Sequence, residues 1–134
     1  MATRDVLLEW LTGRLLADIG VGGIVQDRVF KGKIADIKNP VYPLVTVSRT
    51  MQGEKMRWAP LTEFQLAVVA YSSTSFDQAW NIMEAIQTSL DGISATVEGR
   101  SWVIEQATTP VEDIDPEPVP AYFTGVIFDV RQVA

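Results

Sequence analysis

Residues 75–92, SFDQAWNIMEAIQTSLDG, carry the clearest secondary-structure pattern in this chain of 134 residues. Apolar side chains recur there at helical spacing, at Phe76, Trp80, Met83, Ile86 and Leu90. Ser75 and Gln78 fit a capping box at the start, and Gly92 follows the last turn. The pattern predicts an amphipathic helix. Its aromatic and methionine stripe is typical of packing against a core rather than of a cofactor pocket.

Strand patterns lie on both sides of this helix. Residues 44–48, LVTVS, follow two prolines that favour an extended backbone, and residues 63–71 alternate between apolar and polar side chains. Two more strands are predicted at 102–108 and 122–132 by the same alternation. Residues 28–38 are expected to form a short strand or a loop.

Another helix is predicted near the N-terminus, over residues 4–19, with Thr3 as its cap. Its main apolar face consists of Leu7, Leu8, Leu11, Leu15 and Ile19. The glycines expected to end it are Gly20, Gly22 and Gly23. A second apolar face contains Val6, Trp10 and Ala17. This second face predicts contact with another element of the chain or with another subunit.

The order of these elements predicts an α+β fold. We expect a mostly antiparallel sheet of four to five strands packed against two main helices, with a long hairpin arm at 49–60. The chain shows neither an internal repeat nor a low-complexity linker, so a single domain is expected over residues 1–134.

The composition excludes several kinds of functional site. The chain contains no Cys and no His, so a disulfide, a thiolate zinc site, a Cys nucleophile and an imidazole base are all excluded. Neither a phosphate-binding glycine motif nor a Ser–Lys nucleophile pattern occurs. We therefore predict a protein that is not an enzyme, with no catalytic, cofactor or metal site. The N-terminal residues show no signal peptide or membrane span, which predicts intracellular synthesis and no membrane partner.

Charge is distributed unevenly around a net value of −6. Residues 28–57 hold seven basic and two acidic side chains, whereas residues 58–134 hold two basic and eleven acidic ones. Two copies could therefore attract one another head to tail through unlike surfaces. The alternative is that the unlike charges neutralise one another within one fold.

The basic block also permits binding of a nucleic acid, with Tyr42 and Trp58 available to stack on bases. The acidic residues on both sides of the block argue against tight binding to phosphates. The other interpretation is a basic patch that contacts an acidic protein.

Residues 110–120, PVEDIDPEPVP, combine four prolines with four carboxylates. The prolines predict an extended, semi-rigid loop that is neither helix nor central strand. The loop presents Glu112, Asp113, Asp115 and Glu117. Clustered oxygens could bind a hard cation, but the EF-hand spacing and its glycine are missing, which favours a solvated acidic loop.

Taken in order, four segments and the N-terminal helix resemble the tail terminator, or tail-completion, proteins of long-tailed bacteriophages. The likeness spans almost the whole chain. Its segments are NPVYPLVTVS at 39–48, FQLAVVAYS at 64–72, FDQAWNIMEAI at 76–86 running on to LDG at 90–92, and YFTGVIFDV at 122–130. The proline-rich acidic loop departs from this pattern.

The resemblance implies a structural protein of the virion neck, assembled in the bacterial host cytoplasm. Such a minor tail protein forms a hexameric ring on the head-proximal end of the tail tube, ends tube polymerisation and provides the head–tail joining surface. Its implied partners are further copies of itself, the tail tube protein and the head–tail connector or stopper protein, with genomic DNA as passing cargo.

Several residues become candidates for these contacts. The residues expected at a subunit or partner interface are Trp10, Arg49, Lys55, Arg57 and Trp58. The acidic segment 112–117 would line the channel, where carboxylates repel DNA, or face solvent or the connector. The alternatives are a head-side neck adaptor of the same virion and a nucleic-acid-binding module.

Overall fold

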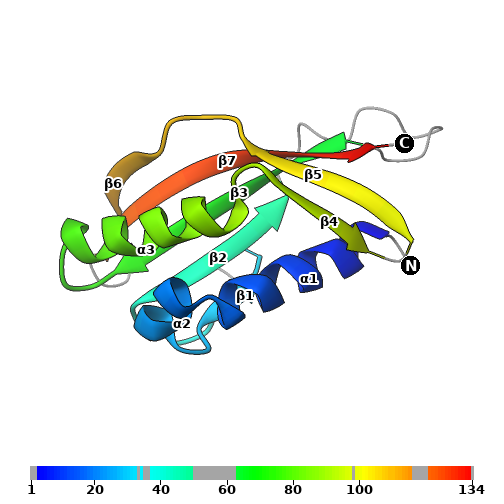
Figure 1. Ribbon diagram of the computed structural model, residues 1–134. Coiled ribbons are helices and arrows are strands. Elements are labelled where there is room, and N and C mark those ends of the chain that lie inside the picture. Colours follow the sequence, from blue (N-terminus) through cyan, green and yellow to red (C-terminus); the bar gives the residue numbers. More distant parts are fainter. Residues whose placement is uncertain are drawn as a thin grey trace.

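The computed structural model describes residues 3–32, 34, 37–49, 63–97, 99–115 and 121–133 (Figure 1). Its elements, in chain order, are α1 (Thr3–Ala17), α2 (Ile19–Val25), β1 (Val29–Lys31), β2 (Leu44–Arg49), β3 (Glu63–Ser72), α3 (Phe76–Leu90), β4 (Ile93–Val97), β5 (Arg100–Gln106), β6 (Val111–Asp115) and β7 (Ala121–Val133). The predicted α+β class is confirmed.

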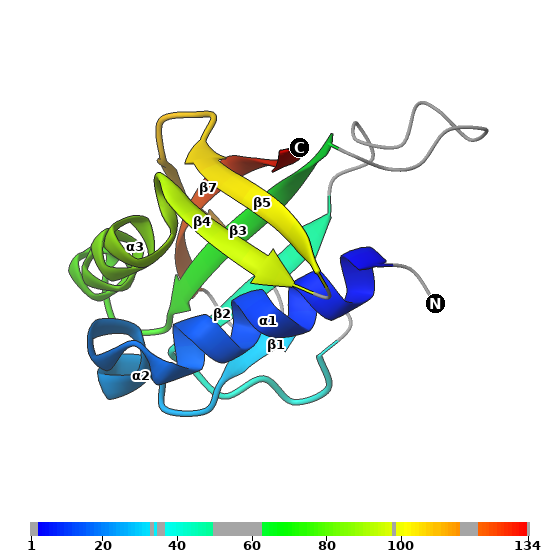
Figure 2. The same ribbon diagram turned by 45° about the vertical axis from the view of Figure 1, so that its right-hand side comes forward.

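The strands form one sheet in the order β1-β2-β3-β7-β5-β4. β6 pairs with the first part of β7, and β5 pairs with its last part. All pairs are antiparallel except β1 with β2. α1 contacts both β1 and β4, the two ends of the strand order, so the sheet curls around this helix (Figure 2).

The sheet is larger than predicted, with seven strands rather than four to five. β4 and β6 are absent from the sequence prediction, and β1 occupies only three residues of the segment 28–38. The antiparallel pairing of β2 with β3 confirms the predicted hairpin, in which Arg49 lies opposite Leu66. The residues between these two strands, 50–62, lie outside the described part of the chain.

α3 begins and ends where the sequence predicts. Ser75 is its N-cap and accepts a 3.1 Å hydrogen bond from the backbone N–H of Gln78. The Gln78 side chain accepts from Ser72 Oγ at 2.6 Å, and the Ser75 N–H donates to that same hydroxyl at 3.2 Å. Half of the capping box therefore forms, because Ser72 takes the place that Gln78 would fill.

The main core lies between the inner face of the sheet and the three helices. α1 contributes Leu11 and Leu15, which are fully buried, in agreement with the predicted apolar face. The largest fully buried side chains include Trp102, Phe128, Leu66, Ile82, Met83, Ile86 and Leu90. At about 25 cal/mol per Å² of buried apolar surface, this layer is the main source of stability.

The glycine-rich segment after α1 corrects the sequence prediction. The chain does not leave helical structure at Gly20 but turns into α2, and Asp18 caps that helix by accepting from the Val21 N–H at 3.0 Å. A Cβ at Gly22 would lie 2.7 Å from the Leu16 carbonyl oxygen. The glycines therefore allow two helices to meet closely instead of simply ending one. α1 also begins at Thr3, which makes this residue helical rather than a cap.

Within the described residues, no helix is both long and apolar enough to cross a membrane.

Candidate interface surfaces

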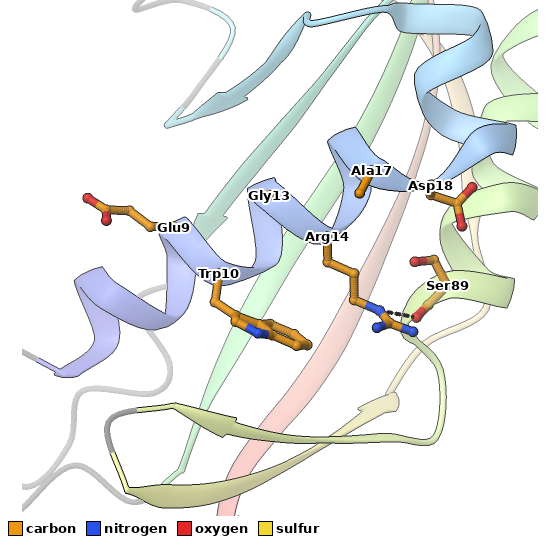
Figure 3. Close-up of a pocket in the computed structure, with 7 residues that line it drawn as sticks. All are labelled: Glu9, Trp10, Gly13, Arg14, Ala17, Asp18 and Ser89. Carbon is orange, nitrogen blue, oxygen red and sulfur yellow. Dashed lines mark hydrogen bonds between the residues drawn. The ribbon is translucent and has the colours of Figure 1, made fainter.

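Trp10 on α1 lines an open pocket (Figure 3). It is half-buried and packs against the main core. The pocket has a volume of about 570 Å³ and is lined by Glu9, Trp10, Gly13, Arg14, Ala17, Asp18 and Ser89. Gly13 and Ala17 are exposed, so this second face of α1 is only partly covered by the chain itself.

Arg14 connects this face of α1 to the end of α3. Its Nε donates a 2.9 Å hydrogen bond to the backbone carbonyl of Ser89 (Figure 3). Its guanidinium carbon also lies 5.7 Å from the centre of the Trp10 ring, within the range of a cation–π interaction. The guanidinium therefore joins two helices and holds the indole, which gives the pocket a defined shape.

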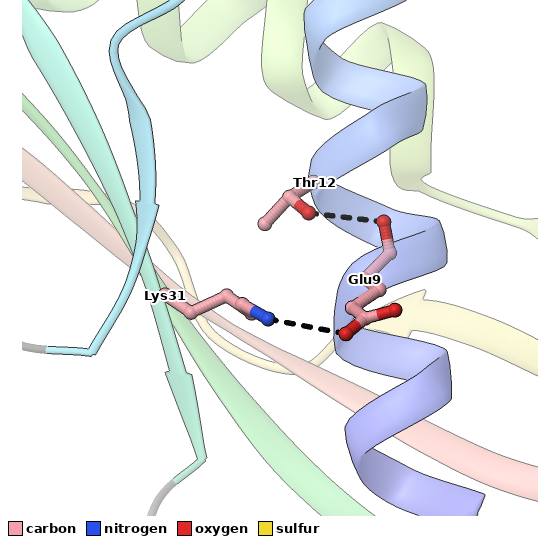
Figure 4. A network of polar contacts seen from close by, with 3 residues as sticks. All are labelled: Glu9, Thr12 and Lys31. Atoms are coloured by element: carbon pink, nitrogen blue, oxygen red, sulfur yellow. Dashed lines mark hydrogen bonds and ion pairs between the residues drawn. The ribbon is translucent and has the colours of Figure 1, made fainter.

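A weaker contact holds the opposite side of α1 to the edge of the sheet. Lys31 Nζ on β1 lies 3.5 Å from Glu9 Oε1, and Thr12 Oγ1 donates to the Glu9 carbonyl at 2.9 Å (Figure 4). The side chains of Lys31 and Glu9 are 49% and 65% exposed. An ion pair this exposed contributes little to stability.

The candidate residues of the hairpin arm are described only at its base. Arg49 is the last residue of β2 and is half-buried. Lys55, Arg57 and Trp58 lie outside the described residues. Trp10 and Arg49 occupy different elements, α1 and the end of β2, and their interface role stays a prediction.

The acidic segment contains a strand where a loop was expected. β6 spans Val111–Asp115 and pairs with Ala121–Gly125 of β7. Pro110 and Pro116 lie just outside it, so no proline interrupts its ladder. In the described chain β6 pairs with β7 alone, so it is an edge strand. This agrees with the prediction that the proline-rich segment does not form a central strand.

The carboxylates of this segment have different surroundings. Glu112 Oε1 accepts a 2.7 Å hydrogen bond from Trp80 Nε1 of α3, and Asp113 Oδ1 accepts a 2.8 Å bond from the N–H of Ile114. Both acidic residues are exposed. Asp115 ends the strand, and Glu117 lies outside the described residues.

Two features of this surface escape sequence reasoning. Trp80 belongs to the predicted core stripe, yet its indole N–H points outward to a carboxylate 32 residues later. Val111 and Ile114 are 63% and 46% exposed. The aliphatic residues among the carboxylates of the segment 110–120 were a sequence signal for a contact surface. No local sequence pattern links Trp80 to Glu112. Within the described ranges, no group of three or more acidic side chains is placed to hold a metal ion.

Comparisons with known proteins add one finding. No family model matches the chain, and no curated protein sequence matches it. Several chains of solved structures do match, and one of them has a TM-score of 0.75 over 98% of this chain and 97% of that chain, at 12% sequence identity. That chain comes from the virion of a native gene transfer agent particle. At this identity, the match establishes a shared fold over nearly the full length of both chains.

Proposed function

We propose that this chain is a structural virion protein without enzymatic activity. The observation that carries the proposal is the shared fold with a virion chain over nearly the whole of both chains. The ordered segments that resemble bacteriophage tail terminators support the same class of protein. The whole chain, residues 1–134, would then act as one domain.

Within that class, the function that we favour is capping of the tail tube. A hexameric ring of this chain would sit on the head-proximal end of the tube, stop further polymerisation and present the head–tail joining surface. A closed ring needs heterologous contacts, in which each subunit offers two unlike surfaces. The basic block 28–57 and the acidic residues that follow it supply such a pair. The other partners would be the tube protein and the connector or stopper protein, with DNA passing through.

Deletion of the gene from its virion-producing genome tests this function. Electron microscopy would then measure the length of the tail tubes. Tubes longer than normal support a terminator. Tubes of normal length that stay unattached to heads contradict it and favour the head-side neck adaptor instead. Complete particles of normal length would contradict both functions.

A second arm of this experiment tests the hairpin. Adding back Arg57→Glu should fail to restore head–tail joining, because the reversed charge removes the basic contact. Arg100→Glu is the matched control, since Arg100 is an exposed arginine at the start of β5 and is not part of the block 28–57. Normal joining by Arg57→Glu would remove the proposed role of the basic arm.

A further inference from the structure

β6 presents apolar side chains at an open edge of the sheet. Val111 and Ile114 account for two of the five large apolar side chains that are exposed in the described chain. β7 is the only strand that pairs with β6 there. The Ile114 N–H donates to Asp113 Oδ1 at 2.8 Å, so a side chain already engages this amide and makes it less available to an added strand. A partner would therefore contact this edge mainly through side chains.

Acidic side chains gather where this edge meets α3. Glu112 and Asp113 are exposed on β6, and Asp77 and Glu84 are exposed on α3. The hydrogen bond between Trp80 and Glu112 joins the two elements. No Lys or Arg occurs in the sequence from residue 58 to residue 99. The Arg14 guanidinium reaches α3 only at Ser89, in its last turn. Glu112 and Ile114 share the face of β6 that meets α3, and Asp77, Trp80 and Glu84 share one face of that helix. These two faces, which we call the acidic edge surface, therefore favour a partner that is both basic and apolar.

The chain itself contains a segment of that chemistry. Residues 49–58 combine three basic side chains, Arg49, Lys55 and Arg57, with Met51, Met56 and Trp58. Only Glu54 carries a negative charge there. Apolar residues flanked by cations complement apolar residues flanked by carboxylates, and such complementarity sets the register of a contact between proteins.

The two surfaces lie at opposite ends of the same strands. Arg49, where the basic segment begins, is opposite Leu66 of β3, whereas Ile114 is opposite Tyr122, which is opposite Ser72 of β3. Six residues of strand separate Leu66 from Ser72, roughly 20 Å at about 3.3 Å per residue. Figure 1 shows β6 and the C-terminal end of β7 at opposite sides of the molecule. A contact between unlike, separated surfaces is heterologous, as a ring requires.

We propose that the acidic edge surface of one copy binds the basic segment 49–58 of the next copy. This inference rests on the ring assembly in the proposed function and names the contact that builds it. The exposed Val111 and Ile114 favour a protein contact for β6 over a water-filled channel lined by its carboxylates. The attraction between the charges should weaken as salt concentration rises.

Cross-linking can test the contact directly, because the chain contains no Cys. Full-length Ile114→Cys and Met56→Cys proteins are mixed in equal amounts under mild oxidation and analysed by mass spectrometry. The disulfide between Ile114→Cys and Met56→Cys should form at least tenfold faster than the disulfide between Asp27→Cys and Met56→Cys. Asp27 is exposed in the turn after α2, outside the acidic edge surface. A mixed rate equal to this control, or faster Ile114–Ile114 linkage, overturns the inference.

Charge reversal gives the second arm. Self-association is measured by analytical sedimentation. Glu112→Lys should weaken it at least tenfold, whereas the control Asp27→Lys should leave it unchanged. A mixture of Glu112→Lys with Arg57→Glu should restore association, because the two reversed charges then face each other. Folding of each variant is checked by circular dichroism. If native mass spectrometry shows a hexamer but the cross-link and the rescue fail, this contact is wrong while the ring stands. If the contact forms but tubes keep normal length after deletion, the capping function is wrong while the contact stands.

Discussion

Trp80 Nε1 in α3 donates a 2.7 Å hydrogen bond to Glu112 Oε1 in β6. The indole also packs against the main core, so one side chain joins the interior to an exposed edge strand. A carboxylate acceptor makes such a bond stronger than a neutral one. β6 thus depends on α3 as well as on its pairing with β7.

Replacing this donor should loosen β6 without unfolding the chain. Trp80→Phe keeps an aromatic ring but lacks the N–H, so the amides of β6 should exchange with solvent faster. The free energy of unfolding should fall by less than about 1.5 kcal/mol, because the bond is exposed. Glu112→Gln keeps an oxygen acceptor, so it should change the hydrogen exchange rates of the β6 amides much less. Unchanged exchange in Trp80→Phe would show that β7 alone holds the strand.

Two neighbouring leucines of α1 should behave in opposite ways. Leu15 is fully buried in the main core, whereas Leu16 is 39% exposed. Leu15→Ala should therefore lower the free energy of unfolding by about 2–5 kcal/mol, measured by urea denaturation. Leu16→Ala should stay within about 0.5 kcal/mol of the unaltered protein. Similar losses for both would mean that α1 is rotated relative to the core.

The elements that the sequence predicts well are those that bury one face over many residues. α3 shows this through Met83 and Ile86, and β7 through Phe128 and Val130, all of which are buried. The missed strands are short or depend on distant partners. β4 does alternate at Ile93, Ala95 and Val97, which could have revealed it. β6 has no such alternation, because its apolar residues lie three apart and its pairing depends on β7.

The candidate sites were accessible to sequence reasoning only in part. Trp10 stands out on the second face of α1, and the carboxylates stand out by composition. The pocket beside Trp10 was not predictable, because it depends on the contact of Arg14 with Ser89, 75 residues away. The start of a second helix in the glycine-rich segment was also not predictable. Glycine is selected both at the end of a helix and where two helices pack closely, so the sequence does not distinguish the two.

Neighbouring glycines in α2 provide a test of that close packing. A Cβ at Gly22 would meet the Leu16 carbonyl oxygen at 2.7 Å, a backbone atom that moves little, whereas a Cβ at Gly23 meets nothing within 4 Å. Gly22→Ala should thus destabilise the protein by about 1–2 kcal/mol. Gly23→Ala should stabilise it by about 0.5–1 kcal/mol, because alanine favours helix. Thermal unfolding at fixed protein concentration measures both, and equal shifts would contradict the observed helix contact.

A buried hydroxyl fixes α3 on the sheet and gives the last prediction. Thr124 Oγ1 in β7 is fully buried and donates to the Ala79 carbonyl of α3 at 3.1 Å. Thr124→Val keeps the shape and removes the donor, so the free energy of unfolding should fall by about 0.5–1.5 kcal/mol. Thr88→Val is the matched control, because Thr88 Oγ1 makes an exposed 3.0 Å bond to the Glu84 carbonyl within α3. Water replaces that exposed bond, so the control should change stability by less than about 0.5 kcal/mol. If Thr124→Val is as stable as the unaltered protein in urea, apolar packing alone positions α3, and with it the Trp80 side of the acidic edge surface.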